Sequence, residues 1–356
     1  MRPGLLAVCL LLAAPLSGVE SVKWSGSLPT DPRWLAGEQA RGIAENLLLY
    51  QYPSGGWPKN VDMAKPLTPA QRAELEDRVH DDATIDNGAT TTQIRFLAQV
   101  YAATQEPRYR AAVERGLDYL LAAQYANGGW PQYFPLRKGY YSHITFNDGA
   151  MVNALEVLRA VRDGAAPYAW VDAARRERAG AAVERGIACI LQCQVVQNGR
   201  RTAWSAQHDA TTFAPAWARK FEPPSIASME SAGVVRFLMG VKNPSPEIVA
   251  AVEGALAWFD QVKIPGLRCE IVPAPDQPGG RDRVAIPDPA APPIWARFYE
   301  LGTDRPIFIG RDSVVHYRMD EIEHERRVGY AWYGDAPAKL LEAQRKWRTS
   351  MARAPP

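Results

Sequence analysis

Polar side chains stand at the points where predicted loops meet predicted helices. If the helices pair into hairpins that form a ring, their equivalent junctions face one end of it, and oxygen clusters there suit Ca²⁺ or Mg²⁺. For Asp86-Asn87 and Asn147-Asp148 the alternative is ordinary helix capping, because Asp and Asn are preferred N-cap residues. The junction residues are Lys59, Asp86, Asn87, Asn147, Asp148, His208, Asp209, Arg219, Glu222, Arg305 and Arg311.

Composition narrows the classes of protein that could carry such a site. The 356 residues hold 41 Lys and Arg against 39 Asp and Glu, and 47% of them are hydrophobic. This apolar content can bury a large core, and the formal charge of +2 argues against a globally basic nucleic-acid binder. Eleven Trp and fourteen Tyr suit a core, and they also suit sugar rings. The sequence has no Ser-His-Asp signature, no phosphate-binding glycine loop and no zinc-ligand spacing.

Internal repeats indicate how the junctions are positioned. The stretch Leu47–Pro58, which ends in Gly-Gly-Trp-Pro, recurs as Leu120–Pro131. A degenerate third copy begins at Ile190 and has its Trp at position 204, and a second motif, 84–89, recurs at 145–150. Repeats of this kind indicate stacked units that cannot bury their apolar faces alone.

Apolar spacing predicts the helices of these units. Val113, Leu117, Leu120 and Leu121 follow a helical period. The same pattern at 183–191, a helix between positions 88 and 101, and a final helix over 336–347 complete the expected set. Paired helices with one apolar stripe each pack well as a ring. We therefore predict an all-α fold, an α/α-toroid-like incomplete barrel with long functional loops and few or no strands. The Pro-rich stretch 273–293 is expected to be one such ordered loop.

The N-terminus is typical of a secretory signal peptide. Arg2 precedes an apolar run, Leu5–Leu16, with small residues after it. The predicted organisation is a signal peptide over 1–20 and a single domain over 21–356, secreted to the periplasm or the medium; a buried N-terminal helix is the alternative. Among the remaining cysteines, Cys189, Cys193 and Cys269, we expect buried thiols with at most one bridge, from Cys269 to either of the others.

Seven segments together resemble the pectate lyases of polysaccharide lyase family 10, over most of the predicted mature chain. The resemblance implies an α/α toroid with a substrate groove. In one segment Phe221 stands where the family pattern has tyrosine, and Asp304 stands before Arg305 where the pattern has asparagine. The segments are Gly55–Asn60, Thr84–Thr90, Gly128–Gln132, Phe146–Met151, Ala203–Asp209, Ala218–Ser225, and Trp295–Glu300 continuing through Asp304–Phe308.

The resemblance also implies a reaction and roles for the junction residues. Polygalacturonate would be cleaved by Ca²⁺-dependent anti-β-elimination, in which a base removes the C5 proton and the C4 oxygen leaves. Arg219 would be the base, with Asp148 and Arg305 as further catalytic residues. Asp86, Asn87 and Asp148 would hold Ca²⁺. The substrate-binding set implied by the resemblance is Lys59, Asp86, Asn87, Trp130, His208, Arg305 and Arg311.

Several of these assignments have structural alternatives. Lys59 could be solvated and His208 could be a hydrogen-bonded loop residue. Trp130 could pack in the core, and Arg311 could belong to a surface ion pair. We expect a monomer that binds neither nucleic acid nor membrane.

Two other functions are compatible with the sequence. The first is a catalytically inactive carbohydrate-binding toroid that uses its tryptophans to stack on sugars. The second and more remote is a terpene cyclase, because Gln51–Trp57 and Gln124–Trp130 fit Gln-x-x-x-Gly-x-Trp. Against the cyclase, the sequence lacks an Asp-x-Asp-Asp centre.

Overall fold

Helices are the main secondary structure of the computed structural model, which describes residues 22–24 and 28–352. The predicted signal peptide lies outside these residues. No described helix is both long and apolar enough to cross a membrane. The helices are α1 (Pro32–Ala36), α2 (Glu38–Tyr50), α3 (Pro69–Glu76), α4 (Thr91–Thr104), α5 (Pro107–Ala123), α6 (Ala150–Arg162), α7 (Ala173–Cys193), α8 (Ser228–Met239), α9 (Pro246–Val262), α10 (His324–Gly329) and α11 (Ala336–Ala352).

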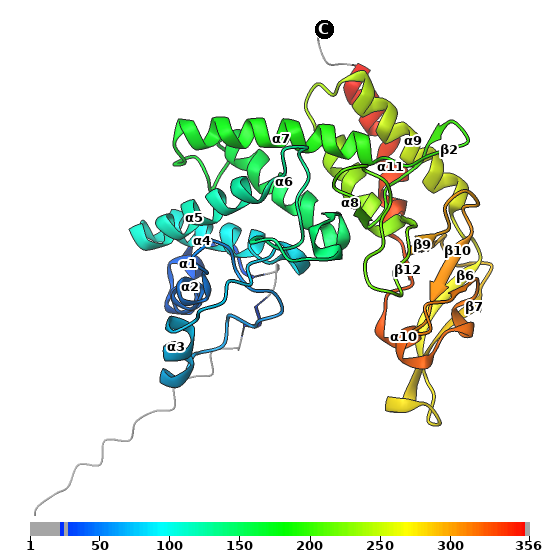
Figure 1. Cartoon of the computed structure of the whole chain (residues 1–356), viewed down its shortest axis with the longest axis horizontal. Helices are drawn as coiled ribbons and strands as arrows, with labels where there is room; N and C mark the ends of the chain where they lie inside the picture. Colours follow the sequence, from blue (N-terminus) through cyan, green and yellow to red (C-terminus); the bar gives the residue numbers. More distant parts are fainter. Residues whose placement is uncertain (1–21, 25–27, 353–356) are drawn as a thin grey trace, which may run out of the picture.

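The helices that the sequence predicts are confirmed, and most of them form hairpins. Helices α4 and α5 pack together, as do α6 with α7 and α8 with α9. Side-chain caps begin several of them: Asp172 accepts from the backbone N–H of Arg175 at the start of α7, and Ser245 accepts from Ile248 at the start of α9. In Figure 1 the segment α1–α7 forms one side of an arch, and α8, α9 and α11 lead to the other side.

The repeated motif ties each hairpin to the next in the same way. The indole nitrogens of Trp57, Trp130 and Trp204 donate to backbone carbonyls at the end of the preceding helix, at 2.8, 2.8 and 2.7 Å. Each motif glutamine, Gln51, Gln124 and Gln194, donates both to its own loop and to a carbonyl of a following helix. The degenerate third copy is therefore structurally equivalent to the first two.

The first glycine of each Gly-Gly-Trp loop is required by geometry. Gly55 has φ +99° and Gly128 has φ +89°, a region that L side chains rarely adopt. A Cβ atom at either position would collide with the backbone carbonyl of Arg115 or Arg185 on the adjoining helix. The loops therefore lie directly against the next hairpin. This contact fixes the position of each loop-to-helix junction relative to that hairpin.

The prediction of an all-α toroid-like fold with few or no strands is wrong. The described residues form twelve short strands in five small sheets. They are β1 (Ile144–Thr145), β2 (Val196–Gln197), β3 (Arg200–Arg201), β4 (Gln207–His208), β5 (Ile226–Ala227), β6 (Leu267–Pro273), β7 (Arg281–Pro287), β8 (Trp295–Ala296), β9 (Phe298–Tyr299), β10 (Pro306–Ile309), β11 (Val315–His316) and β12 (Tyr333–Gly334).

The hairpin of β6 and β7 replaces much of the loop predicted over 273–293. The prolines of this stretch favoured the prediction of a loop, but they occupy positions that a β-ladder tolerates. Pro273 ends β6, Pro287 ends β7, and Pro278 begins the turn between them. In Figure 1 this hairpin lies beside β9, β10 and α10 at the end of the arch opposite α3.

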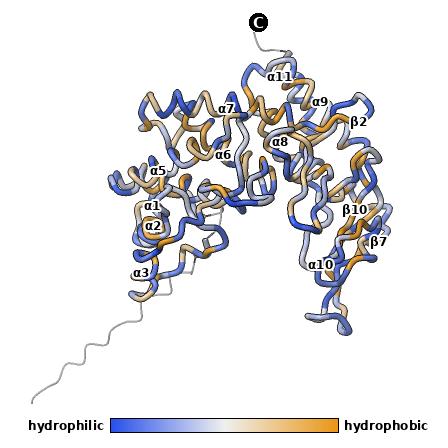
Figure 2. The backbone as a smooth tube through the Cα atoms, viewed as in Figure 1, coloured by the Kyte–Doolittle hydropathy of each residue, from blue (hydrophilic) through white to orange (hydrophobic). Residues whose placement is uncertain are grey.

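One four-stranded sheet, in the order β11-β10-β9-β5, matters most for the site. It places Phe298 opposite both Ala227 and Ile307. A second, smaller apolar cluster forms on it around Phe298, Phe308 and Trp332, apart from the main core between the helices. Figure 2 shows hydrophobic stretches near β10 and β7, and others scattered along the helices.

The cysteines are all thiols in the described part of the chain. Cys189 and Cys193 are buried on α7, and Cys269 is partly buried on β6. This agrees with the expectation of buried thiols, without the optional bridge to Cys269.

Candidate active site

Two three-residue turns of matching shape lie at the centre of the candidate site. The turn Asp86–Gly88 precedes α4 and the turn Asn147–Gly149 precedes α6, and the two turns contact each other. The middle residues Asn87 and Asp148 both have positive φ, 51° and 50°. Asp and Asn tolerate this left-handed conformation better than other non-glycine residues. The two repeats therefore present their polar side chains from equivalent positions.

The capping interpretation of these residues is wrong. Helix α4 begins after Thr90 and α6 begins after Gly149, and neither helix has a side-chain cap. Asp86 and Asp148 contact other side chains instead of the first N–H groups of a helix. Their carboxylates are therefore available to the site.

Asn147 joins the two carboxylates. Its amide nitrogen lies 2.8 Å from Oδ2 of Asp148 and 3.4 Å from Oδ1 of Asp86. Asp86 is 3% exposed, whereas Asp148 is open to solvent. On the other side of Asp86, the Nζ atom of Lys59 lies 2.5 Å from Oδ2. Burial opposes the charge of Lys59, but its hydrogen bond and attraction to Asp86 prevail and raise its pKa.

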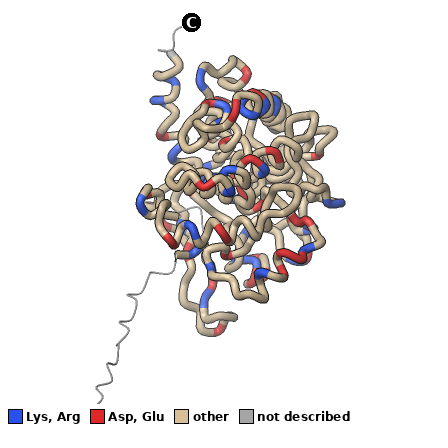
Figure 3. Tube along the Cα trace, turned by 90° about the vertical axis from the view of Figure 1, so that its left-hand side faces the viewer, with Lys and Arg blue, Asp and Glu red and all other residues tan. Residues whose placement is uncertain are grey.

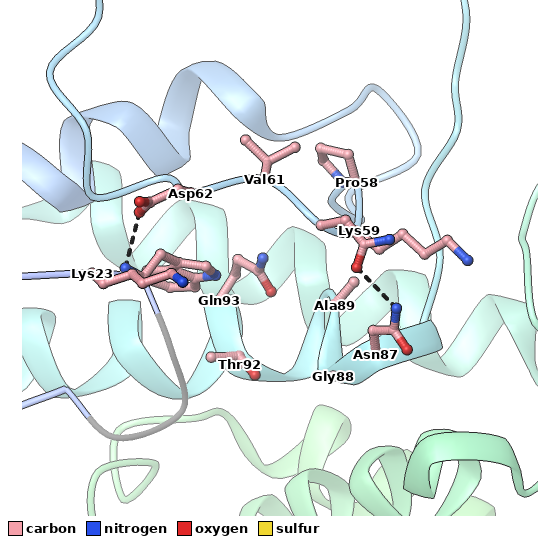
Figure 4. Close-up of a pocket in the computed structure, with 12 residues that line it drawn as sticks. Lys23, Pro58, Lys59, Val61, Asp62, Asn87, Gly88, Ala89, Thr92 and Gln93 are labelled. Atoms are coloured by element: carbon pink, nitrogen blue, oxygen red, sulfur yellow. Dashed lines mark hydrogen bonds between the residues drawn. The ribbon is translucent and has the colours of Figure 1, made fainter. Parts of the chain in front are cut away.

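A polar pocket of about 330 Å³ opens beside the first turn. Figure 4 shows Lys59 and Asn87 near each other in this pocket, with Asp62 farther along it. The Asn87 amide donates to the side-chain oxygen of Asn60 at 2.9 Å. The predicted residues Lys59, Asp86, Asn87 and Asp148 thus lie together in one region.

Arg297 and Glu230 also belong to this region, although neither was among the residues predicted from the sequence. The Nη2 atom of Arg297 lies 2.5 Å from Oε1 of Glu230 and 3.5 Å from Oδ1 of Asp148. Burial opposes the charge of Arg297, but Glu230, Tyr330 and Asp148 raise its pKa. Arg297 lies within a segment that carries the family resemblance, and this is the only sequence signal that could have drawn attention to it.

Arg219 lies on the loop that faces the second turn. Its Nε atom donates to Glu222 at 2.9 Å, and this hydrogen bond raises the pKa of Arg219. Glu222 and Asn147 line the same small pocket, so the Arg219 loop adjoins the Asp148 turn. Arg219 is therefore a protonated partner of Glu222 in this conformation.

Three guanidinium groups surround the ring of Phe221. Those of Arg219, Arg311 and Arg326 lie 5.0, 4.6 and 4.7 Å from its centre. Arg311 is exposed and pairs with Glu325 at 2.8 Å. Phe221 thus gathers three positive charges around one ring. Figure 3 shows acidic and basic residues interspersed along the chain.

Arg305 lies apart from this cluster. It precedes β10 while Arg311 follows it, so the two Cα atoms lie up to about 20 Å apart at roughly 3.3 Å per residue. The Arg305 guanidinium stacks on the ring of Tyr317, 3.5 Å from its centre. The structure therefore brings Arg311, and not Arg305, to Arg219.

Comparison with known families and structures identifies the class of protein. The family model for pectic acid lyase matches residues 51–341. The chain belongs to the pectic acid lyase family. A family 10 polysaccharide lyase from Cellvibrio cellulosa is similar in structure, with a TM-score of 0.75 and 34% identity over 89% of this chain and 98% of the other. A mutant of a Cellvibrio cellulosa family 10 lyase in complex with trigalacturonic acid gives the same TM-score at 33% identity and the same coverage. No curated protein matches the chain.

The family resemblance and the expectation of a pectate lyase are thus confirmed, and the chain is an enzyme of this class. Two members of the predicted substrate-binding set have no exposed surface in this enzyme. Trp130 is completely buried, and its indole nitrogen is used by the carbonyl of Leu120. It is a core residue of the repeat.

His208 is also completely buried in the enzyme. Its Nδ1 atom lies 2.8 Å from the carbonyl of Phe213, and its Nε2 atom accepts from the backbone N–H of Ser205. Burial lowers the pKa of His208 to about 4, so the ring stays neutral. It holds the loop that leads to Arg219 and has no surface for a ligand.

Proposed function

We propose that the enzyme cleaves polygalacturonate by Ca²⁺-dependent anti-β-elimination and releases 4,5-unsaturated oligogalacturonides. The main observation that supports this reaction is the linked group Asp86, Asn147 and Asp148 beside the Arg219–Glu222 loop. An elimination next to a uronate carboxylate needs neutralisation of that carboxylate and a base on the opposite face. The carboxylate-bearing turns and the arginine cluster supply groups of both kinds.

The donor set fits a hard divalent cation. Asp86, Asp148 and the amide oxygens of Asn87 and Asn147 are ligands of the kind that Ca²⁺ takes. Within the described residues no three His, Cys, Asp or Glu side chains form a complete metal-binding group. The remaining oxygens would therefore come from the uronate and from water. Ca²⁺ bound there would supply charge that stabilises the negative C5 centre and its carboxylate.

The protein residues then perform the proton transfer. Arg219 accepts the C5 proton, which requires that its guanidinium leave Glu222, because that ion pair keeps it protonated. Lys59 and Arg311 bind uronate carboxylates on either side of the reacting sugar. We keep Arg305 as a uronate ligand only for a more distant sugar, because it stands at the other end of β10 from Arg311.

Two properties of the whole chain belong to the same proposal. Arg2 and the apolar run Leu5–Leu16 support export of the enzyme to the periplasm or the medium, where its polymeric substrate would be met. Mass spectrometry of the secreted N-terminus tests this, with a first residue between positions 19 and 21 expected. We also propose a monomer, which light scattering tests.

The reaction is tested by the ultraviolet absorbance of the conjugated product. Wild-type enzyme on polygalacturonate should give a rise in absorbance with Ca²⁺ and none with a chelator. Arg219→Lys should lose most turnover while still binding oligogalacturonate. Binding of oligogalacturonate without any rise in absorbance would favour the inactive carbohydrate-binding alternative, and a rise unaffected by chelator would remove Ca²⁺ from the mechanism.

A further inference from the structure

Arg297 is held between two carboxylates by a single nitrogen. Its Nη2 atom lies 2.5 Å from Glu230 and 3.5 Å from Asp148, and its side chain is 12% exposed. The rings of Tyr330 and Phe298 lie 4.7 and 5.7 Å from its guanidinium carbon. Its own backbone is fixed as well, since its N–H donates to Trp332 and its carbonyl accepts from Ser228. The guanidinium therefore has little freedom except to shift between Glu230 and Asp148.

Glu230 has capacity to hold the guanidinium more completely. It lies in the first turn of α8 with its side chain 2% exposed. Its Oε2 atom has no hydrogen-bond partner among the described residues, and neither has the Nε atom of Arg297. A buried carboxylate with an unused oxygen favours any shift of the guanidinium toward it. In the present arrangement Arg297 contacts both Glu230 and Asp148 through Nη2. The second hydrogen bond that Glu230 and Arg297 could form with each other is therefore not made.

We propose that Arg297 is a positioning residue that competes with the metal cation for Asp148, and that Glu230 retains the guanidinium when the cation takes its place. This inference rests on the proposed function, because it requires a cation at Asp148. In the resting enzyme Arg297 holds the Asp148 carboxylate in its orientation and neutralises part of its charge. When the cation binds, the guanidinium withdraws to Glu230 and the orientation of Asp148 is kept by Asn147.

The charges of the site predict whether each substitution strengthens or weakens the binding of a divalent cation. Asp86, Asp148 and Glu230 are anionic and Lys59 and Arg297 are cationic, so the group carries one net negative charge. Removing the charge of Arg297 makes the site more attractive to a divalent cation, and removing that of Glu230 makes it less so. A purely structural role for the pair would weaken cation binding in both variants. The two substitutions therefore separate the explanations.

The experiment is a calorimetric titration of the full-length enzyme with CaCl₂ in the presence of saturating trigalacturonate. An Arg219→Lys background suppresses turnover during the titration. We expect added Arg297→Gln to lower the Kd for Ca²⁺ by at least about fivefold and added Glu230→Gln to raise it by a similar factor. Arg297→Lys keeps the charge and should stay close to the parent.

Arg327→Gln is the matched control. Arg327 pairs with Asp282 at 2.8 Å and is 14% exposed, much like Arg297, but the pair lies away from the two turns. The Kd of the Arg327→Gln variant for Ca²⁺ should equal that of the parent. A Kd for Arg297→Gln that is unchanged or higher, with a parent that binds Ca²⁺, would overturn the inference while leaving the proposed function intact. If Arg297→Gln does not fold, an unchanged or lower Kd in Glu230→Gln has the same consequence. A parent that binds no Ca²⁺ would refute both the inference and the metal requirement of the proposed function.

Discussion

Lys59 and Asp86 form an ion pair in which the carboxylate is buried and the ammonium is not. The Nζ–Oδ2 distance is 2.5 Å, and the side chains are 28% and 4% exposed. A buried carboxylate depends on its partners far more than an exposed one does. Lys59 therefore supplies the positive charge that the buried Asp86 carboxylate requires.

Replacing Lys59 should reveal this dependence. Lys59→Met leaves Asp86 buried without its cation, and we expect the free energy of unfolding to fall by about 2 kcal/mol. Adding Asp86→Asn should recover part of the loss, because the uncompensated charge is then gone. Lys65→Met is the control, since Lys65 is 76% exposed and lies 3.9 Å from Asp62. Chemical denaturation measures all four proteins, and equal stability of Lys59→Met and wild type would contradict the argument.

His208 should make the stability of the enzyme depend on pH. Its pKa of about 4 in the folded protein lies below its usual value of 6.5. Between these values the unfolded chain binds the proton more readily, so stability falls as the pH drops from 6.5 to 4, by about 3 kcal/mol.

His208→Gln should flatten that part of the stability profile, as followed by denaturant unfolding at a series of pH values. The exposed His80 provides the matched variant, His80→Gln, which should retain the full pH dependence. A wild-type profile that is flat between pH 4 and 6.5 would show that His208 is not held neutral.

Trp130→Phe distinguishes a core role from sugar stacking. The substitution removes the indole donor and leaves the Leu120 carbonyl without its partner, at a cost of about 1–3 kcal/mol in stability. Trp57→Phe breaks the equivalent bond to Leu47 and should cost a similar amount. Neither variant should change KM for polygalacturonate at a temperature where both are folded. A raised KM with an unchanged free energy of unfolding would show that Trp130 contacts the substrate.

Arg311 and Arg305 should differ in their effect on substrate binding. Arg311 lies next to Arg219 at Phe221, so Arg311→Gln should raise KM about tenfold, as expected for a lost charged hydrogen bond. Arg305→Gln, at the other end of β10, should raise it less. The melting temperature should hardly change in Arg311→Gln, because the ion pair with Glu325 is exposed. Steady-state kinetics on one substrate preparation compares the two, and the reverse order would place the reacting sugar near Arg305.

The helical hairpins could be predicted because their signals are local. Apolar residues at helical spacing lie within single helices, and the Gln and Gly-Gly-Trp residues of the repeats lie within a few positions of each other. The carboxylates of the two turns could be singled out for the same reason, since Asp86 and Asp148 each belong to a repeated motif. That they bind side chains and do not cap helices depends on the contact between the turns, which no local pattern specifies.

The parts that the sequence analysis missed depend on contacts between distant segments. Arg297 meets Glu230 across 67 positions and Asp148 across 149. The separation of Arg305 from Arg219 depends on the sheet that holds β10. The strands β6 and β7 could not be predicted because the prolines of this stretch favour a loop, and only the structure shows that they lie at strand ends and in the turn. Trp130 and His208 carry side chains that suit a ligand, and only their burial shows that they serve the protein interior.

The two turns differ by an exchange of residues. In the first repeat the order is Asp86-Asn87-Gly88, and in the second it is Asn147-Asp148-Gly149. Each repeat thus contributes one carboxylate and one amide, and neither repeat alone has two acidic groups to offer a divalent ion. The paired carboxylates therefore exist only because the two turns contact each other, and a change in the packing of α4 against α6 would separate them.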